Sequence, residues 1–507
     1  MSKSFFIGIG GTGSRCLESL VHFCASGLGP EQLSLGIVDQ DQSNGNVARA
    51  RQLVDLYSRS RGFFRQQGRN ELAGHHDFLK TEINTPQGDM VWCPLPDTSS
   101  SLRKVFNYSI LKPQLKGVFD CLYSPSELDL FLEEGFRGKP HLGAAAILSN
   151  MDMKQGFWRS IASSINAARG GGDVNIFLAG SIFGGMGASG FPTMVRKLRQ
   201  ILQEGGFSSG VKIGGALFLP YFSFPPPGQS DDQDVAYSEA FLEQTQGALH
   251  YYHNTFETQP DLFDALYLVG WDPLISLGYH QKGGAPQSNP PMIPELYGCF
   301  AALDFFEMNR NDGGKIYHIG RSDEKEFNWS DFPPITHDQN DTKNKLGNLL
   351  RFAFAYKHVY RQNLDRNRFK NVMEEAWFRR TISNMHINLD DDEVERGLNL
   401  LEAYADEVML WSASLMHTSS QPGQPDFKLF SPEYFAYRDE NDPLSETELL
   451  PTNLLSPHQR DGFSSLMKGQ TSSPLHRVYE ELSYKKIEPK HAGLSAFVGS
   501  LYDACRL

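Results

Sequence analysis

Two glycine-rich turns, each placed between an apolar run and a helical pattern, constrain the fold of this chain more than any other feature. The first is FFIGIGGTGSRCLESL, residues 5–20, and the second is NIFLAGSIFGGMGASGFPTMVRKL, residues 175–198. In the first, a short buried strand precedes an amphipathic helix predicted over 14–26. In the second, a buried strand precedes a helix that we expect to begin near Pro192.

The N-terminal part of the chain repeats this alternation of strands and helices. Apolar runs of strand length are separated by helical patterns, including those over 192–204 and 234–253. The predicted strands lie over 5–9, 33–42, 173–180, 211–220 and 263–271. We therefore expect an α/β fold with a mostly parallel sheet that helices cover on both faces.

Further helices are predicted outside this alternation. SPSELDLFLEEG, residues 124–135, begins with Ser124 and Glu127 in the positions of a capping box. Later helical patterns lie over 344–364, 368–384 and 391–416.

Composition and charge exclude several classes of function. A net charge of −13 and a pI near 5.6 leave no general basic surface for nucleic acid. No run of about 18 uninterrupted apolar residues predicts a membrane span, and the N-terminus lacks the apolar core of a signal peptide, so we expect a cytoplasmic protein. The six cysteines have no metal-ligand spacing, which predicts neither a disulfide nor a zinc site.

A glycine-rich turn at the start of a helix suits a phosphate group. Glycine lets the backbone approach the phosphate, while free amides and the helix dipole offset its charge. GIGGTG, residues 8–13, with Asp39 at the end of the next strand, matches a dinucleotide-binding pattern, although such turns also occur for structural reasons alone. The second turn holds more glycines than a tight connection needs, which predicts a nest of backbone amides. Two nests at one sheet edge suit a di- or triphosphate.

With these motifs the chain resembles the tubulin and FtsZ superfamily, and more closely its bacterial tubulin-like branch. The family's loop has the form small-Gly-Gly-Thr-Gly-small-Gly. Residues 183–189 keep three of its glycines and depart from it at Phe183, Met186 and Ser189. GIGGTGSR is similar to the family's first nucleotide loop and VDQDQ to its acidic loop. GFRGKPHLGAAAI is similar to its γ-phosphate-sensing loop. The resemblance covers about the first 320 residues, or roughly three-fifths of the chain.

The resemblance implies a set of nucleotide-binding residues, a cofactor and an assembly. Aligned without gaps on the family's central helix, Asn289 falls where the guanine edge is read, and Asp272 takes a second base-reading place. The expected ligand is GTP or GDP, with Mg²⁺ bound through the phosphates, in a protein that stacks head to tail with itself. The predicted nucleotide-binding residues are Gly10, Gly11, Thr12, Gly13, Ser14, Asp39, Asp41, Gly143, Ser181, Gly184, Gly185, Met186, Gly187, Ala188, Asp272 and Asn289.

A division of the chain follows from the same comparison. At 507 residues the chain exceeds a single ordinary domain of about 150 residues. We expect a nucleotide-binding domain over 1–289, a buried central helix over 290–308 and an α+β C-terminal domain over 309–507. Residues 417–475, rich in Ser, Pro, Gln and Gly, are expected to form extended loops.

Hydrolysis stays open at this point. In the family, an acid after the central helix of the next subunit positions the attacking water. The gapless alignment places Asp312 at the first acid, and Lys315 where the more catalytic acid would lie. A lysine stays charged at neutral pH and cannot accept a proton from water. Either Asp312 is the catalytic residue after a small shift in register, or hydrolysis is slow. A plain turn at this segment is the structural alternative.

These residues favour a tubulin-like guanine-nucleotide-binding protein that assembles head to tail, with GTP hydrolysis that depends on assembly as an open question. One alternative is a non-hydrolysing scaffold, gated by nucleotide, that fixes an interface for partner proteins in a bacterial multi-protein system, including a defence system. The other is an NAD-dependent oxidoreductase that uses GIGGTG and Asp39 on a Rossmann sheet.

Overall fold

The structure is a computed structural model of the 507-residue chain. It describes residues 2–506 except for several segments. These are 67–76, 87–88, 97–100, 133–134, 137–138, 155, 169–170, 207–209, 225–237, 278–283, 309–313, 323–325, 328, 334–338, 420, 422, 425, 428–434, 438–446, 450–474 and 485–492. Asp312 and most of 417–475 therefore lie outside the described residues.

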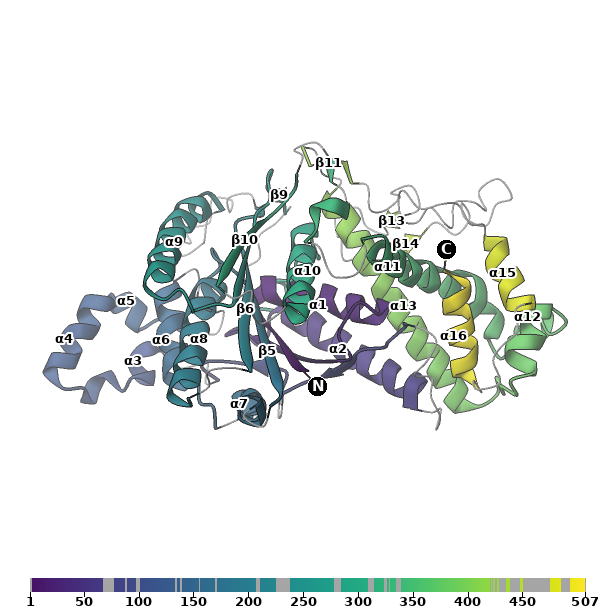
Figure 1. Ribbon diagram of the computed structural model, residues 1–507, viewed down its shortest axis with the longest axis horizontal. Coiled ribbons are helices and arrows are strands. Elements are labelled where there is room, and N and C mark those ends of the chain that lie inside the picture. The colour runs from purple at the N-terminus through teal and green to yellow at the C-terminus, as the bar shows by residue number, and fades with distance from the viewer. Residues whose placement is uncertain are drawn as a thin grey trace.

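An eight-stranded sheet forms the centre of the fold (Figure 1). Its order is β10-β8-β6-β5-β1-β2-β3, and β4 also pairs with β2. The strands are β1 Ser2–Ile9, β2 Gln32–Val38, β3 Glu82–Asn84, β4 Val91–Trp92, β5 Asp173–Ser181, β6 Val211–Phe218, β8 Ala265–Val269 and β10 Lys315–Ile319. Every pairing in this sheet is parallel, which confirms the predicted α/β fold with a mostly parallel sheet.

Helices cover both faces of the sheet, and two neighbouring glycines of β6 show it. A Cβ on Gly214 would lie 2.6 Å from the ring of Phe305, on helix α10 (Ile293–Glu307). A Cβ on Gly215 would lie 2.6 Å from the ring of Phe191, on helix α8 (Gly185–Glu204). Successive residues of a strand point to opposite faces, so α8 and α10 pack on opposite sides of the sheet, as Figure 1 shows.

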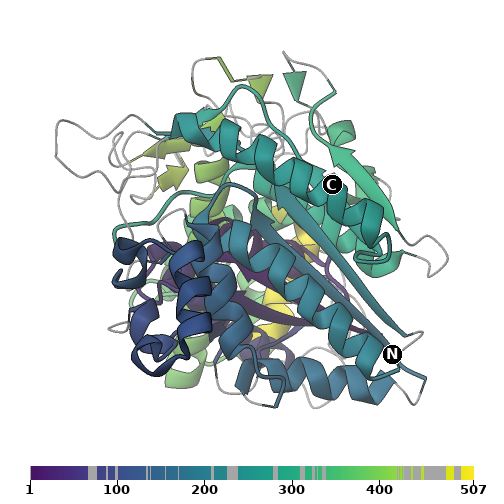
Figure 2. The same ribbon diagram turned by 90° about the vertical axis from the view of Figure 1, so that its left-hand side faces the viewer.

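The helices of the sheet region follow the connections between strands. Figure 2, in which the α8 side faces the viewer, shows α8 and α9 lying across the sheet. The helices are α1 Gly10–Ser26, α2 Gly45–Gln66, α6 Pro140–Asn150, α7 Gly156–Ala168, α8 Gly185–Glu204, α9 Ser238–Thr258 and α10 Ile293–Glu307. Short paired strands lie beside them, β7 Phe222–Ser223 with β9 Ile275–Ser276.

Both helices that follow the glycine turns begin earlier than the sequence predicts. α8 begins at Gly185, so Pro192 lies inside this helix and not at its start. α1 begins at Gly10, and all its residues except Gly11 are buried. The helix therefore lacks the solvent-exposed polar face that an amphipathic helix would have. The reason is tertiary, because α1 lies between the sheet and the helices α2, α10 and α11 (Gln339–Phe354). A helix that is buried along most of its length, α10, stands at the place of the predicted central helix.

A small group of helices projects from the α6 side, at the far left of Figure 1. It consists of α3 Leu102–Val105, the 3-10 turn Tyr108–Ile110, α4 Pro113–Leu122 and α5 Pro125–Leu128. The predicted capping box of Ser124 and Glu127 is present, but the predicted helix over 124–135 is wrong, because it ends at Leu128. Beyond it, Phe131 forms a bridge with Ser101 and leaves the helical path.

The C-terminal region is mainly helical and packs against α1 and α2. Its helices are α11 Gln339–Phe354, α12 Ala376–Phe378, α13 Asp392–Ser419, α15 Leu475–Tyr484 and α16 Leu494–Ala504, with π-helical segments Ala355–Tyr360 and Arg379–Ser383. The helix predicted over 368–384 is wrong, since only short helical pieces occupy it. Short strands are β11 Glu326–Phe327, β12 Asp426–Phe427, β13 Phe435–Tyr437 and β14 Thr447–Leu449.

Strand β10 lies beyond the central helix in the chain, yet it pairs with β8 in the main sheet. Trp411 of α13 donates its indole N–H to Ser19 Oγ of α1 over 3.0 Å, so the C-terminal helices contact the sheet region directly. The boundary between the expected domains at residue 309 stays a prediction.

Candidate functional site

The candidate site lies at the carboxyl edge of the parallel sheet. Because all the strands run the same way, the segments that follow β1, β2, β5 and β8 leave the sheet at this one edge. Most of the predicted nucleotide-binding residues belong to these segments. The structure therefore brings together, at one edge, residues that are far apart in the sequence.

The glycines of the first turn have two separate roles. Gly10 has φ of +67°, a left-handed conformation that favours glycine. Gly13 is needed for packing, because a Cβ there would lie 2.5 Å from the carbonyl oxygen of Ala179 on β5. The close contact of Gly13 with Gly8 on β1 has the same effect. The first turn thus seats α1 directly on the sheet.

Packing also explains part of the second turn. A Cβ on Gly187 would lie 2.4 Å from the carbonyl oxygen of Ser181, and one on Gly190 would lie 2.9 Å from the side chain of Ile9. Gly143 of α6 approaches α8 closely, because a Cβ there would lie 2.2 Å from Ser189 Oγ. The inference that all the glycines of the second turn serve an anion is therefore too strong, since Gly187 and Gly190 are needed for close packing.

The two turns lie side by side. A Cβ on Gly10 would lie 3.3 Å from Met186 Cβ and 3.7 Å from the backbone nitrogen of Gly187. Four residues of the turns are half-buried, and they are Gly11, Gly184, Gly185 and Ala188. The accessible backbone of the paired turns therefore lies at these positions.

Both helix N-termini at this place lack a side-chain cap and an acidic residue in the first turn. The hydrogen-bond ladder of α8 begins with Ala188 N–H donating to Gly184 O over 2.8 Å. The N–H groups of Gly185, Met186 and Gly187 precede it and have no acceptor within the helix. Two adjacent helix N-termini place partial positive charge at one point, an arrangement that can hold an anion.

The hydroxyl groups of the predicted site are engaged within the protein. Ser14 Oγ donates to Gly10 O over 3.0 Å, and Ser181 Oγ accepts from Gly184 N–H over 3.2 Å. Thr12 is 6% exposed, and its Oγ1 lies 3.3 Å from Tyr221 Oη, within hydrogen-bond distance. Contacts to a ligand at these turns would therefore come from backbone amides and not from these side chains.

A buried polar cluster lies directly beneath the first turn. Arg15 Nε donates to Glu295 Oε1 over 2.5 Å, and Arg15 Nη2 donates to Tyr221 Oη over 2.7 Å. Tyr221 in turn donates to Glu295 Oε1 over 2.6 Å. Burial opposes the charge of Arg15, but the Glu295 carboxylate outweighs it and raises the pKa of Arg15 above its ordinary value. The cluster joins α1, the segment after β6 and α10.

Sequence reasoning did not identify this cluster. The signal that could have found it is the presence of an acid, Glu295, and a guanidinium, Arg15, within helical patterns that are mostly apolar or small. Buried charges are almost always paired, so each of them required a partner. The identity of the partner follows only from the fold.

The acidic segment after β2 is buried, and its carboxylate oxygens accept hydrogen bonds from groups within the protein. Burial raises the pKa of Asp39 to about 7, opposed by the backbone N–H of Asp41, which donates to Asp39 Oδ1. The Asp41 carboxylate accepts from Ser43 N–H and Oγ, at 3.0 and 2.7 Å, and from Gly284 N–H at 2.6 Å. Asp41 therefore anchors the segment before α10 to the loop after β2.

The two predicted base-reading residues have different surroundings. Asn289 is half-buried, its N–H donates to Asn46 Oδ1, and its carbonyl accepts from Arg49 Nη2, both over 2.9 Å. Asp272 is exposed in the segment after β8. Asn289 thus lies beside the start of α2. The predicted catalytic Asp312 lies outside the described residues, and Lys315 begins β10.

No protein-family model matches this sequence, and no curated protein is similar enough to it to be counted as a relative. Among the described helices, none combines the length and the apolar character that crossing a membrane requires.

Proposed function

We propose that the protein is a tubulin-like nucleotide-binding protein whose paired glycine turns hold the phosphates of GTP or GDP. The observation that carries the proposal is the contact between the two turns, with Gly10 packed against Met186. Two uncapped helix N-termini meet there, next to half-buried backbone at Gly11 and Gly184. Anions bind at such positions because the N–H groups and the helix dipoles both favour negative charge.

The second turn favours a chain of phosphates over the single pyrophosphate turn of an NAD site. In a Rossmann oxidoreductase the first turn suffices, and the acid after the second strand binds the ribose. Here that acid, Asp39, is 4% exposed, and burial raises its pKa to about 7. A buried carboxyl group that is about half protonated at neutral pH is a weaker ribose ligand than an exposed carboxylate, so the oxidoreductase is the weaker candidate.

Mg²⁺ would be held mainly by the nucleotide. Magnesium prefers six oxygen ligands, commonly one or two carboxylates together with phosphates and water. Both carboxylate oxygens of Asp41 already accept hydrogen bonds, and Asp39 is buried with its Oδ1 accepting from Asp41 N–H, so neither carboxylate is a ready ligand. No group of three or more metal-ligating side chains occurs among the described residues. The residues therefore fit an ion that phosphates and water hold.

Head-to-tail assembly is part of the proposal. It rests on the resemblance to the tubulin and FtsZ superfamily, and the parallel sheet with its buried helix α10 agrees with that resemblance. A heterologous contact whose rotation does not close produces a filament. Asp312 of a neighbouring subunit would then face the nucleotide, and hydrolysis would depend on assembly.

A second candidate is a scaffold that binds nucleotide without hydrolysing it. Phe183, which departs from the family loop, is buried against the rings of Phe222 and Phe241, at 5.4 and 4.9 Å between centroids. Met186 is likewise buried against the first turn. These departures fill a core, and they favour a fixed loop that holds a nucleotide without completing a catalytic site.

Identification of the bound nucleotide tests both candidates. Freshly purified protein is denatured, and the released small molecules are separated by chromatography. We expect GDP or GTP in near-stoichiometric amount, and sedimentation of assemblies when GTP and Mg²⁺ are added. Phosphate release would favour the GTPase, and stable GTP the scaffold. Retention of NAD, or no nucleotide and no uptake of added GTP, would contradict the proposal.

A further inference from the structure

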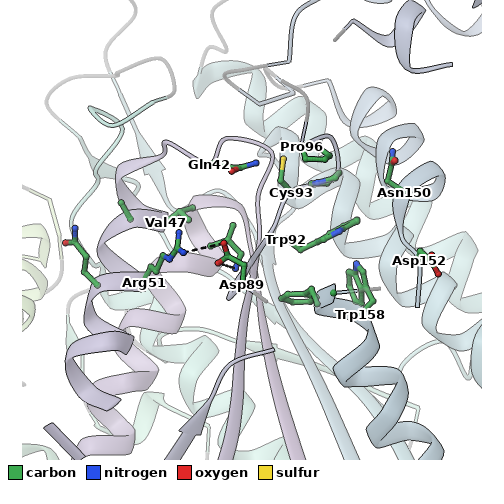
Figure 3. Close-up of a pocket in the computed structure, with 16 residues that line it drawn as sticks. Gln42, Val47, Arg51, Asp89, Trp92, Cys93, Pro96, Asn150, Asp152 and Trp158 are labelled. Carbon is green, nitrogen blue, oxygen red and sulfur yellow. Dashed lines mark hydrogen bonds and ion pairs between the residues drawn. The ribbon is translucent and has the colours of Figure 1, made fainter. Parts of the chain in front are cut away.

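Away from the glycine turns, a cavity opens at the edge of the sheet beside β4 (Figure 3). Its volume is about 710 Å³, within the range of roughly 300–1,000 Å³ typical of small-molecule sites. The start of α2, strand β4 and the segment from the end of α6 to the start of α7 form its walls. The residues that line it include Gln42, Arg51, Asp89, Trp92, Asp152 and Trp158.

Aromatic rings form the inner part of this cavity. The rings of Trp92 and Trp158 lie 5.1 Å apart at 79°, and those of Phe157 and Trp158 lie 5.0 Å apart at 70°. Trp158 is buried, whereas Trp92 is half-buried. A flat ring that enters the cavity can therefore lie against the indole of Trp92, with Trp158 fixed behind it by packing.

One polar atom in this wall has no partner. The indole N–H of Trp158 is buried, and no acceptor for it occurs among the residues that the structure describes. A buried donor without an acceptor costs about 1–3 kcal/mol, which a ligand oxygen or ring nitrogen would remove. The aromatic wall thus lacks one hydrogen-bond acceptor.

The rim of the cavity carries two carboxylates, Asp89 and Asp152, beside Arg51 and the amides of Gln42, Gln52 and Asn150. Asp152 is exposed, and its Oδ1 accepts from Lys154 N–H over 2.9 Å. Asp89 lies across the cavity and pairs with Arg51 over 3.3 Å. Both partners of that pair are exposed, so the pair is weak and can open to a ligand. Carboxylate acceptors at the rim favour a ligand that carries N–H donors on its edge.

We propose that this cavity binds the base of a nucleoside that carries an exocyclic amino group. The base would stack on Trp92, its ring nitrogen or carbonyl would accept from the Trp158 indole, and its amino group would donate to Asp152. No phosphate is required, so the site is independent of the glycine turns. The cavity nevertheless adjoins the acidic segment after β2. Asp39 N–H donates to Trp92 O over 3.2 Å, and Gln42, which lines the cavity, follows Asp41.

Two nucleosides without phosphate provide the sharpest test. Cytidine and uridine have the same ring and sugar, but cytidine carries an amino group where uridine carries a carbonyl. Binding to the full-length protein is measured by ligand-observed NMR and by quenching of tryptophan fluorescence, with excess tripolyphosphate, which carries no base, present to occupy the glycine turns. We expect cytidine, adenosine or guanosine to bind at least ten-fold more tightly than uridine. Equal binding of cytidine and uridine, or no binding by any nucleoside, would overturn the proposal.

Variants at the wall and the rim locate the binding. Trp92→Ala should weaken nucleoside binding about ten-fold or more, since loss of a stacking ring has an effect of that size. Asp152→Ala removes the acceptor oxygens, so it should reduce the preference for cytidine over uridine and leave the fold intact, because the side chain is exposed. Asp55→Ala, on the exposed surface of α2 outside the cavity, is the matched control.

The Asp152→Ala result decides the proposal even if Trp92→Ala does not fold. Thermal denaturation first establishes that the Asp152→Ala protein is folded. If it then keeps the full preference for cytidine, the amino group is read elsewhere and the proposal is wrong. Competition by an uncharged sugar such as maltose would show that the rings serve a carbohydrate, which also overturns it.

Discussion

Arg15 and Glu295 are 280 positions apart in the chain, yet Arg15 Nε lies 2.5 Å from Glu295 Oε1 in a fully buried ion pair. Arg15 stands one turn into the helix that follows the first glycine turn, and Glu295 stands at the start of the central helix. The pair therefore fixes the position of the proposed phosphate-binding turn relative to α10.

Breaking this pair should destabilise the protein strongly. Glu295→Gln keeps the shape of the side chain but leaves the Arg15 charge buried without its counter-ion, which should lower the free energy of unfolding by about 3–5 kcal/mol. Urea denaturation measures the change. Removing both charges, as in the Arg15→Met, Glu295→Leu double variant, should recover most of the loss. A single variant as stable as the wild type would show that the pair contributes little.

Asp39 should make stability depend on pH. Its pKa is raised by burial to about 7 in the folded protein, compared with about 3.9 in the unfolded chain. Between these pH values the folded state binds more protons than the unfolded state. The stability that Asp39 contributes to the folded protein is therefore full below about pH 4 and is lost as the pH rises to about 7. The side chain of the Asp39→Asn variant cannot titrate, so this variant should lack the pH-dependent contribution of residue 39 to stability.

The comparison of the two proteins isolates this effect. Burial also raises the pKa of Glu407 to about 7 and lowers that of His22 to about 3, so the wild-type profile contains other contributions. The difference in unfolding free energy between wild type and Asp39→Asn, measured from pH 4 to pH 8, removes these shared terms. Parallel profiles over that range would contradict a raised pKa at Asp39.

Two glycine substitutions should have opposite effects on stability. Gly13→Ala places a methyl group 2.5 Å from the Ala179 carbonyl oxygen and should cost about 1–3 kcal/mol through overpacking. Gly62→Ala, inside α2, meets no atom within 4 Å and should stabilise the helix by about 0.5–1 kcal/mol. Thermal unfolding compares the two variants. Equal effects would mean that Gly13 is not required for packing.

A charge at the second turn should separate anion binding from helix stability. Ala188 is half-buried in the first turn of α8. Ala188→Glu adds a negative charge, which favours the helix N-terminus itself but repels phosphate, whereas Ala188→Gln adds a similar volume without the charge. The Glu variant should bind GTP about ten-fold more weakly than the Gln variant, with no loss of thermal stability. Equal GTP affinities would argue against phosphate at this turn.

Several features of the fold follow from local sequence patterns. The apolar runs that end at Ile9, Ser181 and Phe218 become parallel strands, because continuous apolar segments between helices are stable only when both faces are buried. The central helix is also predictable, since its apolar residues occupy every side. These predictions depend on neighbours within a few positions of each other.

Other features were decided by contacts between distant segments. The glycines at 13, 187 and 190 appear in the sequence as a phosphate-binding pattern, but the structure gives them a packing role against β5, β1 and their neighbours. The helices at these turns begin earlier than predicted, because the small residues of the turns are helical and fit closely against the sheet.

The sequence by itself determined the α/β class, the parallel strands and the buried central helix, since periodicity and apolar content are local properties of the chain. The tertiary structure alone decided that the two glycine turns touch, that Asp41 anchors the segment before α10 and that Arg15 meets Glu295. The physical reason is that burial removes water from each polar group. The group must then find a partner wherever the fold brings one near, and that place is not encoded in its sequence neighbours.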